Sequence, residues 1–289
     1  MLAFLKKKFT LYWPLIKSLQ TGLLLVTGFT GYVSANCPVL TWDHTLGLLI
    51  SLFLTVSGST VLNMVYDRDI DAKMKRTAQR PLPAGKLSVQ EALTVGLLLS
   101  SFGMGLAFAL SELFGWVVFA GWFLDVLVYT VWLKRRTAWS IVWGGISGGM
   151  PILAGRVLAV GEIDLIGILL TLAILLWIPT HILTFSMRYY DDYQRAGVPT
   201  FPSSYGYQTT RVIIALSSLG AALSIGIGAV ALGLAWGYLR LLAVLTMGII
   251  GLSLASIYKP SERVNFGLFK FASLYMLSSM LIFAFGVAS

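Results

Sequence analysis

Long apolar stretches recur along the whole chain, separated by short segments that hold most of the charged residues. Nine stretches are about 20 residues long, enough for an α-helix to cross the ~30 Å hydrocarbon core of a bilayer. Since an open sheet leaves backbone groups unpaired in lipid, each stretch is predicted to be a helix. The nine predicted spans are Leu15–Ala35, Thr45–Val65, Val89–Leu110, Phe114–Leu133, Ala138–Leu158, Leu165–Met187, Thr209–Leu232, Tyr238–Ile257 and Phe266–Val287. We expect an all-α integral membrane protein: a helical bundle around a central cavity, in a single domain over residues 1–289.

The connecting segments alternate in charge. On one side of the predicted bundle the segments are basic, and on the other side Arg156 and Arg240 are the exceptions to an almost complete lack of basic residues. The basic segments are Lys6–Lys8, Arg68–Lys86, Lys134–Arg136, Arg188–Arg211 and Lys259–Lys270. Basic loops stay in the cytosol, so the N-terminus is expected there, and an odd number of spans puts the C-terminus outside. Lys6–Lys8 is not followed by a signal-peptide cleavage pattern, and we expect the plasma membrane of a prokaryote.

Composition agrees with a membrane protein. Hydrophobic residues make up 57% of the chain and charged residues 11%, whereas about a quarter of a soluble domain is charged. The net charge of +9 is therefore attributed to loops that set topology, and we expect contact with membrane lipid and none with nucleic acid. The single cysteine, Cys37, excludes an intrachain disulfide and a multi-cysteine metal site.

Three polar residues stand four apart where the second span ends: Asn63, Asp67 and Asp71. On a helix this spacing puts all three side chains on one face. Carboxylates held together repel each other, but they suit Mg²⁺, which takes one or two carboxylates plus substrate phosphates. Ionisable groups at the membrane boundary usually face a cavity rather than lipid. The register therefore indicates a Mg²⁺ site.

Cations follow these carboxylates directly. The next segment carries Lys73, Lys75, Arg76 and Arg80 before Pro81. Such a mixture is explained if a diphosphate bridges the two sets, with metal ions screening part of its charge and guanidinium groups binding the rest. A solvated loop with balanced charges is the alternative interpretation of the same run.

The stretch from Asn63 to Gly85 is similar to the first acidic motif of the UbiA-type prenyltransferase superfamily, and most like its heme O synthase (protoheme IX farnesyltransferase) branch. Three further stretches resemble that branch and keep its motif order along most of the chain. They are Tyr129–Arg135, Gly144–Pro151 and Asp191–Pro199. The resemblance implies an intramembrane enzyme that binds an isoprenyl diphosphate through Mg²⁺.

Two departures concern the acceptor. Where the branch usually carries Trp-x-Pro-Pro-His-Phe-Trp, this chain reads Trp177-Ile-Pro179-Thr-His181-Ile-Leu, and Arg156 stands after Gly155 where a tryptophan is usual. The resemblance implies that His181 contacts heme, with Arg156 beside the acceptor, whereas a helix–helix hydrogen bond is the alternative for His181. Asp125, a carboxylate within a span, is either functional or bonded to a neighbouring helix.

The resemblance also implies a second acidic site. The superfamily has a D-x-x-x-D motif after the sixth span, but here Arg188 stands four residues before Asp192, and Asp191 precedes it. We expect Asp192, and to a lesser extent Asp191, to join Asn63, Asp67 and Asp71 as metal ligands. Arg188 then contacts phosphate directly.

The remaining site residues complete the expected reaction centre. Lys134 is expected to bind the diphosphate, and Tyr129 to face the allylic cation, because an aromatic face attracts positive charge; an interfacial tyrosine beside topology-setting charges is the alternative. The set of expected catalytic residues is Asp67, Asp71, Tyr129 and Lys134, and the set of diphosphate-binding residues is Arg68, Arg76, Arg80, Lys134 and Arg188.

The expected reaction moves a farnesyl group from farnesyl diphosphate to a vinyl group of heme B, which is a substrate and not a cofactor. A quinone-precursor aromatic or a glycerophosphate lipid is an alternative acceptor for the same chemistry. Pro151 and Pro179 interrupt spans, as helices of transporters often are, so a transporter is a further alternative. An inactive assembly protein is another, since Arg188 replaces an acidic residue.

Overall fold

The computed structural model describes residues 10–35 and 41–288. Within these residues every regular element is a helix, as predicted. The elements are α2 (Ser18–Val33), α3 (Trp42–Tyr66), α4 (Arg68–Lys73), α5 (Val89–Leu110), α6 (Glu112–Phe123), the π-helix η1 (Leu124–Leu133), α7 (Ser140–Val160), α8 (Leu165–Arg188), α9 (Tyr190–Ala196), α10 (Phe201–Ala231), α11 (Trp236–Tyr258) and α12 (Glu262–Ala288). The predictions that concern Lys6–Lys8 and Cys37 lie outside the described residues.

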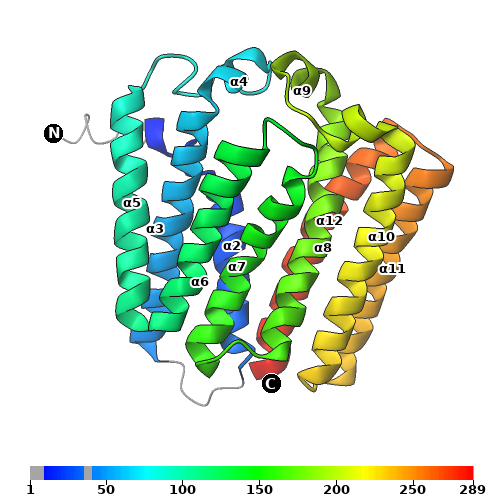
Figure 1. The fold of residues 1–289 in the computed structure, drawn as a ribbon. Helices are drawn as coiled ribbons and strands as arrows, with labels where there is room; N and C mark the ends of the chain where they lie inside the picture. The colour runs from blue at the N-terminus through cyan, green and yellow to red at the C-terminus, as the bar shows by residue number, and fades with distance from the viewer. Residues whose placement is uncertain (1–9, 36–40, 289) are drawn as a thin grey trace.

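The long helices run side by side and antiparallel to their chain neighbours (Figure 1). In the described part of the chain, 8 helices are long and apolar enough to cross a membrane, with α6 and η1 counted as one span from Glu112 to Leu133. They coincide with the second to ninth predicted spans. The first predicted span, Leu15–Ala35, contains α2, whose 16 residues are shorter than the ~20 that a bilayer requires.

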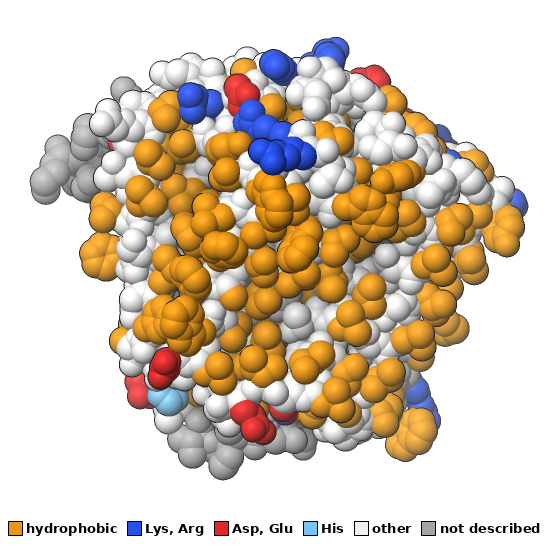
Figure 2. Space-filling model, in the orientation of Figure 1, with side chains coloured by type: hydrophobic (Ala, Val, Ile, Leu, Met, Phe, Trp, Pro, Cys, Tyr) orange, Lys and Arg blue, Asp and Glu red, His pale blue; other side chains and the backbone are white. Residues whose placement is uncertain are grey.

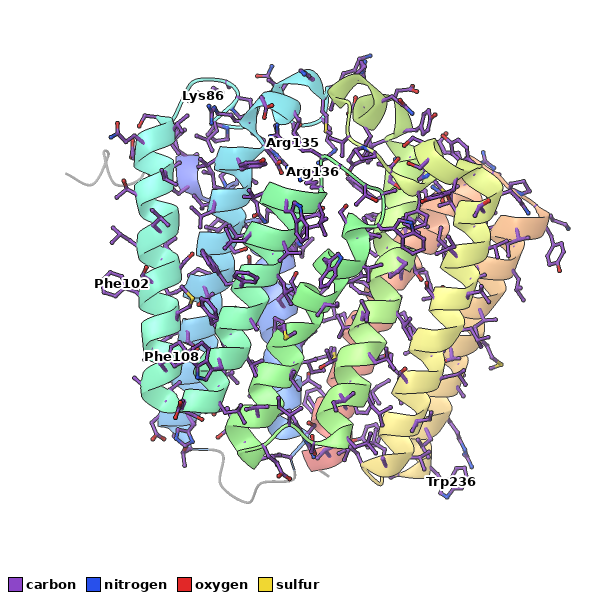
Figure 3. All side chains as sticks on the ribbon, in the orientation of Figure 1. Lys86, Phe102, Phe108, Arg135, Arg136 and Trp236 are labelled. Atoms are coloured by element: carbon purple, nitrogen blue, oxygen red, sulfur yellow. The ribbon has the colours of Figure 1, made fainter. Side chains whose placement is uncertain are left out.

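The outer surface of the bundle is apolar through its middle. Figure 2 shows hydrophobic side chains over the centre of one face, with Lys and Arg gathered near the end that carries α4 and α9. Figure 3 shows Phe102 projecting outward from α5, and Lys86, Arg135 and Arg136 at the charged end. Phe102 is 69% exposed. An apolar belt of this kind is expected of a protein whose solvent is lipid.

Helices α2 and α7 approach each other through glycines. A Cβ atom at Gly155 would lie 1.9 Å from the backbone oxygen of Gly28, and one at Gly31 would lie 2.0 Å from that of Ile152. Small residues of this kind allow transmembrane helices to pack backbone against backbone. The contact joins the N-terminal helix to the centre of the bundle.

Substituting Gly155 by alanine is therefore expected to destabilise the protein. The new methyl group meets backbone atoms that cannot rotate away, and overpacking of this kind typically costs about 1–3 kcal/mol. Gly105 is the matched control, since a Cβ there meets nothing within 4 Å, and Gly105→Ala should leave stability unchanged or slightly higher. Thermal melts in detergent measure both variants. Equal melting temperatures would contradict the close approach of α2 and α7.

Two short helices cap the bundle at the charged end. Helices α4 and α9 pack against each other there (Figure 1). Their contact is a small apolar cluster in which Tyr193 lies against four buried residues, Ile70, Met74, Ala196 and Val198. The two segments with acidic motifs, far apart in sequence, are thereby held together over the ends of α3 and α8.

Candidate functional site

The junction between α3 and α4 keeps Asn63, Asp67 and Asp71 on one face. The Asp67 N–H donates to the Asn63 carbonyl at 2.9 Å, and the Asp71 N–H donates to the Asp67 carbonyl at 2.8 Å. The helical hydrogen-bond pattern therefore continues through the junction, although α3 ends at Tyr66 and α4 begins at Arg68. All three side chains are buried. The register predicted from the sequence is present in the structure.

Asp67 lies at the centre of this face. Its Oδ2 atom accepts a hydrogen bond from the Lys134 amino group. Its Oδ1 atom is buried without a hydrogen-bond partner, and an Arg135 guanidinium nitrogen lies 3.8 Å from it. A buried, unpaired carboxylate oxygen is costly unless something binds it. This atom is the one most available to a cation.

The π-helix η1 places Lys134 beside Tyr129. The Lys134 N–H donates to the Tyr129 carbonyl at 2.8 Å, five residues back, and the Lys134 amino nitrogen lies 5.6 Å from the centre of the Tyr129 ring. In an α-helix, residues five apart point to different faces, so the wider turn is what pairs them. Burial lowers the pKa of Lys134, but Tyr129 and Asp67 raise it more, and the net pKa lies above its ordinary value. Lys134 is therefore a permanent cation.

Asn63 is held by a polar network that includes Asp125. The Asn63 Nδ2 atom donates to Asp125 Oδ2 at 2.9 Å, and the Thr130 hydroxyl donates to Asn63 Oδ1 at 2.8 Å. Ser59 also donates to Asp125 Oδ2. The network fixes the orientation of the Asn63 amide, and it pairs Asp125 with a neighbouring helix, which was one of the two possibilities left by the sequence.

Helix α4 and the loop after it carry basic residues that were expected at the site. Arg80 donates to Asp71 Oδ2 at 2.8 Å. Arg68 is exposed and donates to the Val65 carbonyl at 3.3 Å. The Arg76 guanidinium lies over the rings of Phe185, at 4.9 Å, and Tyr189, at 5.4 Å. Of these three guanidinium groups, the one with a printed contact to a site carboxylate is that of Arg80.

Asp192 joins the two capping segments. Its carboxylate oxygens accept hydrogen bonds from the backbone N–H groups of Lys75 and Arg76, each at 3.3 Å, and from the Arg195 side chain. Burial raises the pKa of Asp192, but these three donors outweigh it and the net pKa is below the ordinary value. Asp191 is exposed beside it. In this arrangement Asp192 holds the loop that carries Arg76 over α9.

The acidic residues do not form one shared cluster. Among the residues that the structure describes, no group of three or more His, Cys, Asp or Glu side chains is close enough to hold a metal ion. The five predicted metal ligands are thus divided into two groups. Asn63, Asp67 and Asp71 lie at the α3–α4 junction, and Asp191 and Asp192 lie at the start of α9. Mg²⁺ needs only one or two protein carboxylates when phosphates supply other ligands. The unpaired Oδ1 of Asp67, with Asp71 one turn away, provides a donor set that fits it.

His181 and Arg188 belong to a different part of the structure. His181 stacks between Trp177 and Phe269, with ring centres 5.1 and 4.6 Å away, and its Nδ1 atom hydrogen-bonds Ser273 at 3.2 Å. The Arg188 guanidinium lies 3.9 Å from the centre of the Phe266 ring. The described contacts of both residues are therefore within α8 and with α12, not with the α3–α4 face.

Arg156 lies near the C-terminal end of α7, close to the start of α8, whereas His181 lies in the second half of α8. It forms hydrogen bonds with both carboxylate oxygens of Asp164, at 2.6–3.2 Å, and with the backbone of Ser34. Burial raises the pKa of Asp164, but Arg156 and the Gly167 N–H lower it, and the net pKa is below the ordinary value. The structure therefore does not bring Arg156 to His181. The Arg156 guanidinium instead pairs with Asp164 and Ser34, and this contact links the ends of α2, α7 and α8.

Arg135 lies beside the site but was not among the site residues predicted from the sequence. Arg135 donates to both carboxylate oxygens of Asp69, at 2.6 and 2.8 Å, and to the Tyr66 carbonyl at 2.7 Å. These bonds attach the end of η1 to the α3–α4 junction. Its place directly after Lys134, in a segment matched to the superfamily, was the available signal.

The model of the UbiA prenyltransferase family matches residues 24–280. The chain is similar to the protoheme IX farnesyltransferase of Pyrobaculum islandicum, at 36% identity over 91% of this chain and 94% of that protein. It is also similar to the protoheme IX farnesyltransferase of Korarchaeum cryptofilum, at 44% identity over 71% of this chain and 69% of that protein.

Solved structures share the fold at low identity. A structure described as a digeranylgeranylglyceryl phosphate synthase superposes with a TM-score of 0.80 at 20% identity, covering 97% of this chain and 99% of that one. A UbiA homolog from Archaeoglobus fulgidus, bound to GPP and Mg²⁺, superposes with a TM-score of 0.68 at 16% identity, covering 94% and 99%. These likenesses extend along nearly the whole chain.

Proposed function

The chain belongs to the UbiA prenyltransferase family, and on that premise we propose that it transfers a farnesyl group from farnesyl diphosphate to a vinyl group of heme B, forming heme O. The observation that carries the proposal is the similarity to protoheme IX farnesyltransferases over almost the full length of both chains. The buried acidic face at the α3–α4 junction supplies the chemistry that a diphosphate donor requires.

The same proposal includes the arrangement in the membrane. It places nine spans, with α2 as the first, in the plasma membrane of a prokaryote, and treats residues 1–289 as one domain around a central cavity. The end with α4 and α9 faces the cytosol, because the basic loops gather there (Figure 2). This orientation leaves the C-terminus outside and opens the donor site to a diphosphate from the cytosol.

The donor site centres on Asp67 and Asp71. Both are proposed to hold Mg²⁺, with Asn63 as a further oxygen donor, and the unpaired Oδ1 atom of Asp67 supports this. Asp192 and Asp191, at the start of α9, are proposed to complete the ligand set once substrate binds; Asp192 already contacts the loop after α4. A bound Mg²⁺ ion neutralises diphosphate charge as a Lewis acid.

The Lys and Arg side chains of the site are proposed to neutralise the remaining negative charge of the diphosphate leaving group. Lys134 and Arg80 already lie against the site carboxylates, and Arg68 and Arg76 stand on the same segment. Charge builds on the bridging oxygen as the bond to the allylic carbon breaks, which is when fixed cations stabilise the system most. The ring of Tyr129 is proposed to face the allylic cation that results.

The acceptor completes the reaction. The allylic C1–oxygen bond breaks with its electron pair on the diphosphate, and the π electrons of the heme vinyl group form the new bond to C1. Water then adds to the resulting cation on the heme side chain and releases a proton, which gives the hydroxyethylfarnesyl group. The apolar helices exclude water from the first step, and His181 is proposed to contact the heme.

The test is direct. Purified protein in lipid vesicles receives farnesyl diphosphate, Mg²⁺ and heme B, and mass spectrometry follows heme O and released diphosphate. We expect heme O, and no product when Mg²⁺ is chelated. Release of diphosphate with prenylation of a quinone-precursor aromatic or a glycerophosphate lipid in place of heme would show that the acceptor is wrong. Absence of any turnover would favour a transporter or an assembly protein.

A further inference from the structure

Helices α8 and α12 together present a continuous cluster of aromatic rings, which we call the aromatic cluster. Its members are Trp177, His181, Phe185, Tyr189, Phe266 and Phe269. Successive ring centres lie between 4.6 and 6.0 Å apart. The α8 members stand four residues apart, which places them on one helical face. All but Trp177 are only partly buried. Because rings of the cluster stack on one another, we take its exposed area to lie mainly along the ring edges.

A row of three cations borders the charged end of this cluster. Arg188 is its middle member: it shares the Tyr189 ring with Arg76, at 5.9 and 5.4 Å. It also shares the Phe266 ring with Lys270, at 3.9 and 4.5 Å from the ring centre. Arg76 and Arg188 therefore lie against the same ring, and so do Arg188 and Lys270.

Little negative charge balances this row within the described structure. The carboxylate beside Arg188 is that of Glu262, 3.7 Å away, whose side chain is 78% exposed. An exposed pair at that distance contributes little. The site carboxylates Asp67 and Asp71 are instead paired with Lys134 and Arg80. The row therefore carries positive charge that is free to bind an anion.

We propose that Arg188 binds the carboxylate end of the acceptor while the ring edges of the aromatic cluster pack against the face of the acceptor's planar ring. This inference rests on the proposed function, because heme B is a flat aromatic macrocycle with two carboxylates on one edge. A guanidinium group donates two parallel hydrogen bonds to a carboxylate, and a stacked arginine loses little side-chain freedom on binding. Anchoring the carboxylate edge determines which vinyl group reaches the donor. Arg188 is then a residue of acceptor specificity and not a diphosphate ligand.

The test separates the two substrates. Arg188→Gln should raise the KM for heme B about tenfold, the loss expected when a charged hydrogen bond is removed, and leave the KM for farnesyl diphosphate within about twofold. Arg188→Lys should recover part of the loss. Arg263→Gln, which removes an exposed charge from the start of α12, should change neither value. A higher KM for farnesyl diphosphate with an unchanged KM for heme B would return Arg188 to the diphosphate site.

A second, independent test changes the acceptor instead of the protein. The dimethyl ester of heme B lacks both negative charges, so its KM with the unchanged protein should be about tenfold higher, and Arg188→Gln should add no further loss. Quenching of tryptophan fluorescence by heme B without donor measures binding apart from turnover, and Trp177 lies in the cluster. Equal binding of heme B and its ester would overturn the inference while heme O formation left the proposed function intact. A protein that binds heme B through Arg188 but prenylates another acceptor would overturn the function alone.

Discussion

Asp67→Asn is expected to lower the rate of diphosphate release about a hundredfold or more, the scale of loss when one group that stabilises a developing charge is removed. The substitution keeps the size of the side chain but removes its negative charge. In the structure the Oδ1 atom of Asp67 is buried without a hydrogen-bond partner, and it is the oxygen that a metal ion is expected to bind. The measurement is diphosphate release over a range of Mg²⁺ concentrations, which should show a weaker Mg²⁺ dependence as well as a lower rate.

Asp69 provides a matched control two residues away. It is exposed, and it forms an ion pair with Arg135 at 2.6 Å. The Arg135 hydrogen bonds lower its pKa below the ordinary value, against a smaller raising effect of burial. Asp69→Asn makes the same chemical change to a carboxylate outside the buried face and should alter the rate by less than about threefold. Full turnover by Asp67→Asn would remove the metal site from the proposal.

Binding of heme B serves as the control that the Asp67→Asn protein is folded. Loss of the Asp67 charge leaves Lys134, whose side chain is 21% exposed, beside a neutral group, and a largely buried charge without a partner destabilises a protein. Some decrease in melting temperature is therefore expected. Quenching of tryptophan fluorescence by heme B should persist in Asp67→Asn, which would assign the lost rate to the donor site.

The features predictable from the sequence are those set by short-range spacing. The positions of Asn63, Asp67 and Asp71 four residues apart define a helical face before any neighbour is known. Eight of the predicted spans likewise depend only on their own length and apolar character. Each of these predictions needs one helix alone, and the structure agrees with them.

Contacts between helices were not predictable in this way. The pairing of Arg156 with Asp164 depends on the turn between α7 and α8, so the sequence, which suggested an acceptor role for Arg156, could not show this contact. Arg188 occupies the sequence position of an expected carboxylate, yet its side chain contacts Phe266 of α12. The π-helical turn that brings Lys134 to Tyr129 has no marker in the hydrophobic pattern. Each case depends on which elements pack together.

Removal of the Lys134 charge is expected to slow the reaction and, at the same time, to strengthen the binding of Mg²⁺. Lys134→Met should lower kcat about a hundredfold, because a fixed cation beside the leaving group is lost. The same change should lower the Mg²⁺ concentration that gives the half-maximal rate, since Lys134 is the ion-pair partner of Asp67 in the structure. Removing a positive charge within a few ångströms of the site strengthens the binding of another cation several-fold.

These opposite signs distinguish an electrostatic role from damage to the fold. A misfolded variant would lose rate and Mg²⁺ binding together. Arg136→Met is the matched control, because Arg136 is an exposed cation at the same end of the bundle (Figure 3), and it should change neither value by more than about twofold. If Lys134→Met needs as much Mg²⁺ as the unchanged protein, then Lys134 does not compete with the metal for Asp67. The ion pair seen between these two residues would then persist through the reaction, and the metal would have to be held by Asp71 and Asn63.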